Sequence, residues 1–494
     1  MKENPQYRLK SSPKLKILVF LVFSFIFCQS LSSQSIMWQK TYERNTQLVG
    51  NDACQTADGN FVITGATSIA SHGYAIFVMK INGLGDTLWT NTIPNAPDEN
   101  DVASVITATD DGGVVIAGQN DTAWACKLDN SGNIIWHKKY LLFSRFSEDI
   151  KKTDDNGFII CGYVNDLPIS AFIFKIDSMG SLIWDRTFSY QFLRVFYSIA
   201  KHDSGFILTG FESPSIGSPN KMIIFCVNNQ GDSLWQKSYY FNNRSSSGRK
   251  IIKMNNDYFI GSGTVDSSKG QIAFMKIDMN GDSIFTRRFP VNGRDNYFNS
   301  FAVANNKLIF SYARDSSFGL ANSYGLITDL NGNIINQKVF TNSSFVWGAL
   351  RGIVPIANGD ILFAGTGQLQ PSARVIYAVR TDSLLNTSEY IGVEQISNNV
   401  PKSFYLFNNY PNPFNPTTTI KYEIPKDAEI TIRVYDLLGR EVFSINEYKK
   451  AGSYEVKFDG ANLASGMYLY KLVVGDNTNN GGIFSDTKKM VVLK

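Results

Sequence analysis

Few residues in this 494-residue sequence stand at spacings that support catalysis. None of the three histidines has a Ser, Cys or carboxylate at a spacing that indicates a nucleophile or a metal site. They are His72, His137 and His202. The aspartate-rich turn at 278–282 resembles a calcium loop, but Ser283 and Phe289 stand where an EF-hand has Gly and Glu. We therefore predict no catalytic residue, no metal and no cofactor.

Carboxylates keep an enzymatic alternative open. Five of them are expected near one face of the predicted fold: Glu99, Asp101, Glu148, Asp149 and Glu212. A glycosidase needs two carboxyl groups roughly 5 to 9.5 Å apart in a cleft. A secreted polysaccharide hydrolase or lyase is therefore the alternative to a binding protein without enzymatic activity.

The elements that must position these residues repeat along the chain. A five-residue apolar run ending in glycine recurs, and the copies from Gly65 to Gly365 are on average 50 residues apart. The copies are FVITG at 61–65, VVIAG at 114–118, FIICG at 158–162, FILTG at 206–210, FIGSG at 259–263, a degenerate LIFSY at 308–312 and ILFAG at 361–365. A period of this length is typical of propeller blades.

Each repeat predicts four short antiparallel strands. A turn rich in Asp, Asn and Gly, as at 58–60, precedes the apolar run and suits a tight hairpin. A third strand follows, and a fourth carries an aromatic residue whose recurrence indicates packing between blades. These aromatic residues are Trp89, Trp136, Trp184, Trp235 and Phe285. We predict an all-β fold with a seven-bladed β-propeller over residues 34–390.

The N-terminal segment 36–42 (IMWQKTY) is similar to a fourth strand, such as SLWQKSY at 233–239, yet it precedes any first strand. The last repeat has no aromatic residue in its fourth strand, where 384–386 reads LLN. We expect the N-terminal strand to complete the last blade, which would cover an exposed sheet edge.

Ligand binding is expected on the face where the connections vary. Because strands alternate in direction, the connections after the second and fourth strands open on one face, and these differ most in length and content. The residues there most able to stack on or clamp a ligand are Trp124, Tyr190, Phe241, Arg244, Arg314, Asp315 and Trp347. An extracellular glycan or protein is the expected ligand.

Charge and cysteine content limit the partners. Outside residues 1–33 the chain has 42 basic and 42 acidic residues, so no long-range field attracts nucleic acid. The remaining cysteines lie in or beside predicted strands of different repeats, which favours free thiols over disulfides or a zinc site. They are Cys54, Cys126, Cys161 and Cys226.

The N-terminus has the layout of a signal peptide. Five basic residues precede an apolar run from Ile17 to Cys28, and small polar residues follow through Ser33. The run of 12 residues is too short for the roughly 20 that a membrane-spanning helix needs. We expect export, and no transmembrane segment.

Four blocks mark residues 404–494: YPNPFNP at 410–416, DLLGREV at 436–442, LASGMYL at 463–469 and KKMVVLK at 488–494. Together they resemble the C-terminal sorting domain of cargo for the type IX secretion system. The resemblance implies an Ig-like β-sandwich that binds the secretion machinery. The motif residues that it marks are Tyr410, Pro411, Asn412, Pro413, Phe414, Asp436, Gly439, Arg440, Gly466, Tyr468, Lys488 and Lys489.

The predicted organisation is a signal peptide at 1–33, a propeller at 34–390, a polar linker at 391–403 and a sorting domain at 404–494. It predicts a protein that passes through the periplasm to the outer-membrane surface or the extracellular space. Binding or scaffolding without enzymatic activity is the first hypothesis for the propeller.

Overall fold

The computed structural model describes residues 37–44, 46–69, 73–93, 101–119, 122–140, 145–240, 245–266, 269–289, 296–315, 321–340, 345–369, 373–387, 393–397, 403–449, 451–476 and 479–493. The predicted signal peptide at 1–33 lies outside them. The regular secondary structure of the described residues is β-strand, as the sequence predicts.

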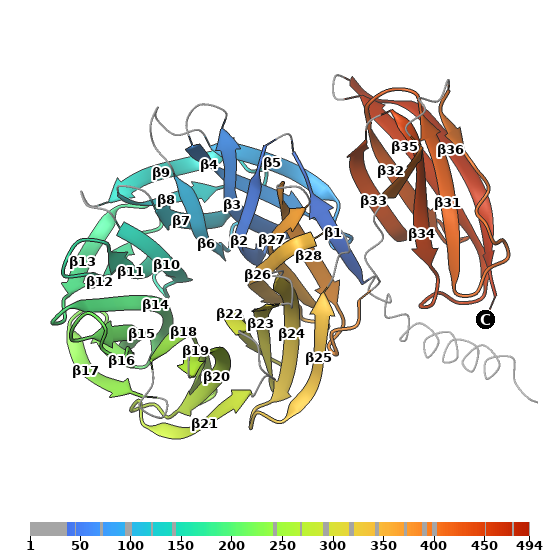
Figure 1. Cartoon of the computed structure of the whole chain (residues 1–494). Helices are drawn as coiled ribbons and strands as arrows, with labels where there is room; N and C mark the ends of the chain where they lie inside the picture. Colours follow the sequence, from blue (N-terminus) through green and yellow to red (C-terminus); the bar gives the residue numbers. More distant parts are fainter. Residues whose placement is uncertain are drawn as a thin grey trace, which may run out of the picture. The chain divides into compact units, whose positions relative to one another are not determined.

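Two groups of sheets follow one another along the chain (Figure 1). The strands of the first group are β1 (Trp38–Tyr42), β2 (Leu48–Gln55), β3 (Phe61–Ile69), β4 (Gly73–Ile81), β5 (Thr87–Ile93), β6 (Val102–Ala108), β7 (Val114–Gln119), β8 (Ala123–Leu128), β9 (Ile134–Tyr140), β10 (Arg145–Lys152), β11 (Phe158–Val164), β12 (Ser170–Ile176), β13 (Leu182–Phe188), β14 (Leu193–His202), β15 (Gly205–Ser213), β16 (Lys221–Asn228), β17 (Ser233–Tyr239), β18 (Ser246–Met254), β19 (Asp257–Asp266), β20 (Lys269–Ile277), β21 (Ser283–Phe289), β22 (Asn296–Ala304), β23 (Lys307–Asp315), β24 (Ala321–Asp329), β25 (Ile334–Phe340), β26 (Phe345–Pro355), β27 (Ile361–Leu369) and β28 (Arg374–Thr381).

The first group is a β-propeller. Five separate four-stranded sheets comprise β2–β5, β6–β9, β10–β13, β14–β17 and β18–β21, and an eight-stranded sheet comprises β22–β28 with β1. Within this last sheet a single parallel bridge, Ala321 to Trp347, joins two antiparallel runs. The first strands contact one another in a closed cycle, β2, β6, β10, β14, β18, β22, β26 and back to β2. Figure 1 shows the sheets arranged around a common axis.

The recurring glycine has a steric cause. A Cβ atom on Gly65 would lie 1.8 Å from the carbonyl oxygen of Val49, and one on Gly162 would lie 1.8 Å from that of Phe146. In both places the first strand of the sheet bulges toward the second strand, so its backbone occupies the space of a side chain. The glycine that reveals the repeat in the sequence therefore marks the bulge in the fold.

The ring closes through the N-terminal strand, which confirms the prediction from the sequence. Strand β1 pairs antiparallel with β28, with Trp38 opposite Arg380. The indole of Trp38 is buried and donates a hydrogen bond to the carbonyl of Gly83, 3.0 Å away, in the sheet that begins the ring. Strand β1 thus supplies both the edge strand and the aromatic residue that 382–387 lacks.

The other fourth-strand aromatics also pack between blades, as predicted. Trp89 donates to the carbonyl of Asn130 in the next sheet at 3.0 Å, and its ring fills the space beside Gly132. Trp136 and Trp184 repeat the contact with Ser178 and Asn229, each at 3.2 Å. These contacts join one sheet to the next around the ring.

The propeller core is apolar, and its cysteines are reduced. Apolar side chains from facing sheets form one buried cluster after another around the ring. Cys126, Cys161 and Cys226 are buried within it and Cys54 is partly buried, and all four are free thiols. This confirms the preference for free thiols.

The second group of strands forms two sheets around a separate core. One sheet has the order β29 (Val393–Ser397), β34 (Gly452–Asp459), β31 (Thr417–Ile424) and β30 (Tyr405–Leu406). The other has the order β33 (Glu441–Lys449), β32 (Ala428–Tyr435), β35 (Gly466–Asp476) and β36 (Asn479–Val492). Strand β29 lies inside the segment 391–403, where the sequence predicts a linker, and pairs with β34. That part of the segment is a strand because Val393 continues the sheet beside Val456.

Removing residues 37–42 should lower the melting temperature of the full chain strongly. The deletion exposes the edge of β28 and loses the burial of Trp38, which alone is worth about 3 kcal/mol or more. Thermal unfolding followed by circular dichroism measures the change. Trp184→Ala is the matched control, because it removes an indole from the same kind of contact and leaves its strand in place. Equal effects of the two changes, or an unchanged transition in the deletion, would contradict closure by β1.

Candidate functional site

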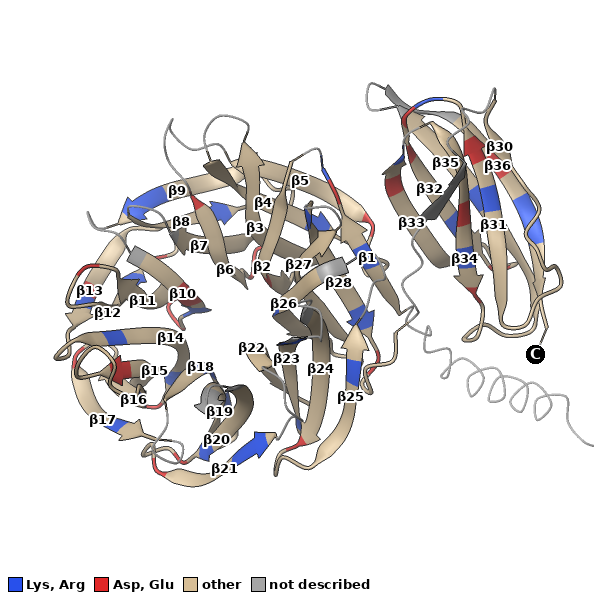
Figure 2. Ribbon diagram, in the orientation of Figure 1, with Lys and Arg blue, Asp and Glu red and all other residues tan. Residues whose placement is uncertain are grey.

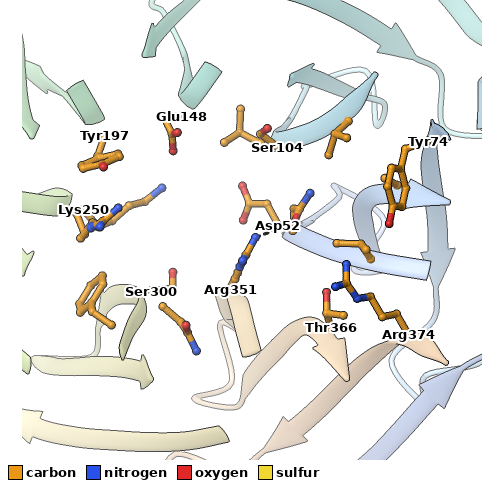
Figure 3. Close-up of a pocket in the computed structure, with 18 of the residues that line it drawn as sticks. Asp52, Tyr74, Ser104, Glu148, Tyr197, Lys250, Ser300, Arg351, Thr366 and Arg374 are labelled. Atoms are coloured by element: carbon orange, nitrogen blue, oxygen red, sulfur yellow. Dashed lines mark hydrogen bonds between the residues drawn. The ribbon is translucent and has the colours of Figure 1, made fainter. Parts of the chain in front are cut away.

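A cavity of about 700 Å³ lies within the propeller, lined by residues of strands from every part of the ring. Tyr74 and Arg374 contribute to it from the first residues of β4 and β28, directly after the connections that follow second strands. The cavity therefore lies on the side where the sequence predicts the variable connections. Its size is that of a typical small-molecule or oligosaccharide site. Figure 3 shows side chains from several strands that point into this common space.

Seven of the lining side chains come from β-bulges. In every first strand the pairing register skips one residue, and this extra residue lines the cavity. The bulged residues are Asn51, Ser104, Glu148, Tyr197, Arg249, Asn299 and Arg351. A bulge turns the extra side chain away from the regular alternation of the strand. The same local deformation thus presents a different side chain to the cavity from each strand.

The residues that directly follow the bulges form hydrogen bonds and ion pairs with neighbouring blades. Asp52 accepts hydrogen bonds from the backbone amides of Ala53 at 2.9 Å and Ile106 at 3.2 Å. Asp149 accepts one from the hydroxyl of Ser198 at 2.6 Å, and its other oxygen faces Lys250 at 3.1 Å. These two carboxylates therefore hold the scaffold together, and burial raises the pKa of Asp52.

Glu148 differs from both carboxylates. It is half-buried on the cavity wall, and no hydrogen bond to its carboxylate occurs among the described residues. Burial raises the pKa of Glu148 to about 7, although Arg249 and Arg351 act in the opposite direction. Glu148 therefore changes charge near neutral pH.

Two arginines are held in place without a carboxylate partner. The guanidinium of Arg249 lies 4.1 Å from the ring centre of Tyr197, whose other neighbour is the ring of Phe211 at 5.7 Å. Arg351 donates to the amide oxygen of Asn51 at 3.1 Å. Within the described part of the chain, neither arginine forms a salt bridge. Their remaining N–H donors face the cavity and are available to a ligand.

Of the seven residues predicted to bind a ligand, Trp347 lines the cavity. Trp124 does not, because the connection before it is short and Trp124 already belongs to β8. Its side chain is fully buried and fills the space beside Gly118. Tyr190 is half-buried and stacks on Arg194 at 5.1 Å, where that arginine pairs with Glu212.

The other four predicted residues lie elsewhere or outside the described residues. Arg314 is half-buried, stacks on Tyr324 at 4.6 Å and donates to Asn296 at 3.1 Å. Asp315 ends β23, and the side chain of that residue is not described. Phe241 and Arg244 fall outside the described residues. The structure does not bring the predicted set together.

The five predicted carboxylates also separate. Glu148 lines the cavity, whereas Asp149 and Glu212 are buried in ion pairs with Lys250 and Arg194. Asp101 is buried, and Glu99 lies outside the described residues. Glu148 was among the carboxylates that the sequence offers for the enzymatic alternative, whereas the other six bulged residues were missed because a polar residue within a predicted strand gives no sign of its own that it faces a cavity. A signal exists, since Asn51, Ser104, Glu148 and Arg351 each stand 14 positions before the glycine of their repeat.

The predicted sorting motif divides into buried and exposed residues. Phe414 is buried and pairs with the last strand, because its amide donates to Val491 at 3.0 Å. Asn412 accepts from the same residue at 2.9 Å, so the first and last blocks of the motif lie together. Tyr410 is 82% exposed. Pro411 and Pro413 are on the same segment and Lys488 and Lys489 are on β36.

The two middle blocks form a turn and a strand. Asp436 accepts hydrogen bonds from the amides of Leu438 and Arg440, while Gly439 takes a positive φ of 77°. Gly466 begins β35, and the hydroxyl of Tyr468 donates to the carbonyl of Ala464 at 3.0 Å. The exposed side chains of Leu437 and Leu438 project from the turn.

Residues 408–492 match the family model described as "Secretion system C-terminal sorting domain". This confirms the resemblance found in the sequence. The domain is a type IX secretion system sorting domain, and it indicates secretion to the cell surface or the extracellular space. The match covers β31 to β36 of the second group of sheets and says nothing about the propeller. A search of curated proteins gives no match.

Several solved structures are similar to the chain. A protein of unknown function from Dyadobacter fermentans is 8% identical, with 69% of this chain and 97% of that chain covered and a TM-score of 0.41. The β-propeller domain of the Trilobed protease from Pyrococcus furiosus is 11% identical, with 68% and 96% covered and a TM-score of 0.41. A PL25 ulvan lyase is 10% identical, with 68% and 95% covered and a TM-score of 0.45. No activity is transferred from these similarities.

Two further features of the described residues bear on the site. No group of three or more His, Cys, Asp or Glu side chains among them could hold a metal ion. No helix in the described ranges is long and apolar enough to cross a membrane.

Glu148→Gln should change the pH dependence of stability. The folded chain binds the Glu148 proton more tightly than the unfolded chain, where the pKa is near 4.5, so this group destabilises the folded state increasingly as pH rises from 4.5 to 7. The variant should melt at a higher temperature than the wild type at pH 8, and this difference should be much smaller at pH 5. Calorimetric melting at both pH values is the measurement. An equal difference at both pH values would show that Glu148 is not protonated in the folded chain near neutral pH.

Proposed function

We propose that this protein is an exported ligand-binding propeller that its C-terminal domain delivers to the cell surface or the extracellular space. In this proposal residues 1–33 are a signal peptide that directs the chain to the periplasm. Residues 34–390 form a propeller of seven blades. An Ig-like domain at 404–494, with β29 added from the predicted linker, then carries the chain across the outer membrane. The closed cycle of first strands supports the blade number, and the two packed sheets around one core support the sandwich.

The proposed ligand, an extracellular glycan or protein, binds in the central cavity. The observation that carries this proposal is the set of bulged residues, because seven separate deformations each place one side chain in the same space. Most are polar, and Glu148, Arg249 and Arg351 keep hydrogen-bonding capacity that the described residues do not use. Polar side chains that converge on a concave surface are the usual signature of a ligand site.

A hydrolase or lyase remains the second candidate, and Glu148 is the observation that favours it. A carboxyl group with a pKa near 7 on a cavity wall can act as a general acid or base. However, the nearest carboxylates in the sequence and in the cavity, Asp149 and Asp52, are engaged by backbone and lysine donors. Among the described residues, Asp149 and Asp52 are therefore not free to be the second carboxyl group of such a mechanism, and this favours binding without catalysis as the proposal.

Ser104→Trp should abolish ligand binding while the fold persists. Ser104 is a bulged residue, and a large side chain in its place fills the cavity without removing another contact. The full chain and the variant are compared on an array of extracellular glycans and proteins, with an activity assay on polysaccharides beside it. Ser131→Trp, on an exposed turn, is the control. Equal binding by both variants would show that the ligand binds outside the cavity.

Removal of residues 404–494 should leave the propeller in the periplasm. The sorting domain is the part of the chain that the secretion machinery recognises, whereas the propeller has its own closed core. Protease treatment of intact cells, followed with an antibody to the propeller, measures surface exposure. Periplasmic extracts should contain the truncated protein in folded form. Truncated protein at the cell surface in wild-type amounts would contradict the role of the domain.

A further inference from the structure

The charged side chains that line the cavity are predominantly basic. Four carry positive charge and two are acidic, Asp52 and Glu148. The basic residues are Arg249, Lys250, Arg351 and Arg374. This is a local property, since Lys, Arg, Asp and Glu are interspersed along the strands of the ring (Figure 2). Lys250 shares the buried Asp149 with Lys151, at 3.1 and 2.7 Å, so its charge is partly compensated and the three arginines are the charges best placed to meet a ligand.

Two of these arginines, Arg249 and Arg351, are held in position by contacts with neighbouring side chains. The stack of Arg249 on Tyr197, backed by Phe211, fixes the plane of its guanidinium. Arg351 is held by Asn51, whose own amide nitrogen donates to the carbonyl of Ala103 at 2.9 Å. Guanidinium groups that are fixed in plane bind carboxylate or sulfate oxygens with two parallel hydrogen bonds. Both therefore have the geometry for an anionic group of a ligand.

Glu148 is the acidic residue of the cavity that interacts electrostatically with this pair of arginines, at longer range than a salt bridge. Arg249 and Arg351 both stabilise its ionised form electrostatically, while no hydrogen bond to either is formed. An anion that enters the site meets the same two arginines and replaces Glu148 as their partner. When Glu148 is ionised, its negative charge repels this anion. When Glu148 is protonated, that repulsion is absent.

The rest of the lining suits a sugar. Aromatic side chains, Tyr74, Phe298 and Trp347, lie among hydroxyl and amide groups such as Ser300 and Thr366. Aromatic rings pack on the apolar faces of sugar rings, and hydroxyl and amide groups exchange hydrogen bonds with sugar hydroxyls. An acidic peptide would bind the arginines through its carboxylates, but it has no sugar rings to pack on the aromatic residues and fewer hydroxyl groups to pair with the polar lining. The composition therefore favours a glycan over a protein.

We propose that the cavity binds an acidic oligosaccharide, with a carboxylate or sulfate group held by Arg249 and Arg351 in place of their electrostatic interaction with Glu148. The inference rests on the proposed function, and it names the ligand class for the same site. Binding is coupled to pH, because protonation of Glu148 removes the negative charge that competes with the ligand. The charged or titratable groups around Glu148 are Asp149, Tyr163, Tyr197, Arg249, Lys250 and Arg351.

The test uses the purified full chain and four probes at physiological salt. Short oligomers of dextran sulfate and of polygalacturonate present the two anionic groups, dextran is the neutral control and polyglutamate is the acidic peptide. Calorimetric titration should show binding of one or both acidic glycans and no binding of dextran. Arg249→Ala and Arg351→Ala should each weaken that binding by about tenfold or more, whereas Arg186→Ala, outside the cavity, should not.

The pH dependence gives a second readout that a general loss of structure would not produce. Sulfate esters stay charged between pH 6 and 8, so any change in their affinity comes from the protein. The wild type should bind dextran sulfate more tightly at pH 6 than at pH 8, and Glu148→Gln should bind equally at both.

Three results would overturn the inference. They are stronger binding of dextran or polyglutamate than of the acidic glycans, affinities insensitive to both arginine variants, or the same pH dependence in Glu148→Gln as in the wild type. A neutral glycan that binds the wild type but not Ser104→Trp would refute this inference and leave the proposed function standing. Absence of any cavity ligand on the array would refute both.

Discussion

The pairing of β1 with β28 is the interaction on which the rest of the propeller depends. Each sheet contacts its neighbours in the ring, so the cavity in the middle exists only while the ring is closed. The last sheet cannot close the ring with its own chain, because 382–387 forms a turn and no strand. Trp38 and the strand that carries it supply the missing edge and attach it to the sheet that begins the ring. The chain ends of the propeller are thereby paired, and no sheet edge is left open at that point.

Within the closed ring, a second constraint makes the site. Each first strand bulges beside one particular residue of the second strand. That residue is glycine in β3, β7, β11, β15 and β27, Ser262 in β19 and Tyr312 in β23. Because of the bulge, two consecutive residues of the strand can have different roles, one facing the cavity and the next contacting the neighbouring sheet. The residue after the bulge reaches the neighbouring sheet, where Asp52 and Asp149 accept backbone or hydroxyl hydrogen bonds, although Asp52 and Lys250 also border the cavity. The bulged residue itself faces the cavity, where it can vary without disturbing the ring. A uniform scaffold can therefore present a specific set of side chains.

The fold was largely predictable from the sequence, and the site was not. The glycine of each repeat is visible because a Cβ atom there collides with the neighbouring backbone, and the aromatic of each fourth strand is visible because it must fill the space beside a turn glycine. Both are packing requirements, and packing leaves regular patterns. Trp124 was misassigned because its size suggested a ligand contact, whereas it fills the space beside Gly118 in the core. The seven bulged residues, among them Glu148, Arg249 and Arg351, have no residue type common to all of them, so their position relative to the repeat is the signal that unites them.

The structure supports a division of labour between the two parts of the chain, in which the C-terminal domain directs secretion and the propeller binds a ligand. The central claim is that the ligand binds in the cavity, with an anionic group between Arg249 and Arg351. A crystal structure of the full chain with a sulfated oligosaccharide at pH 6 tests it most directly. The account predicts a sulfate group within hydrogen-bonding distance of both guanidinium groups, with a sugar ring near Trp347 or Tyr74. An oligosaccharide bound on the outer strands, with the cavity empty, would contradict it.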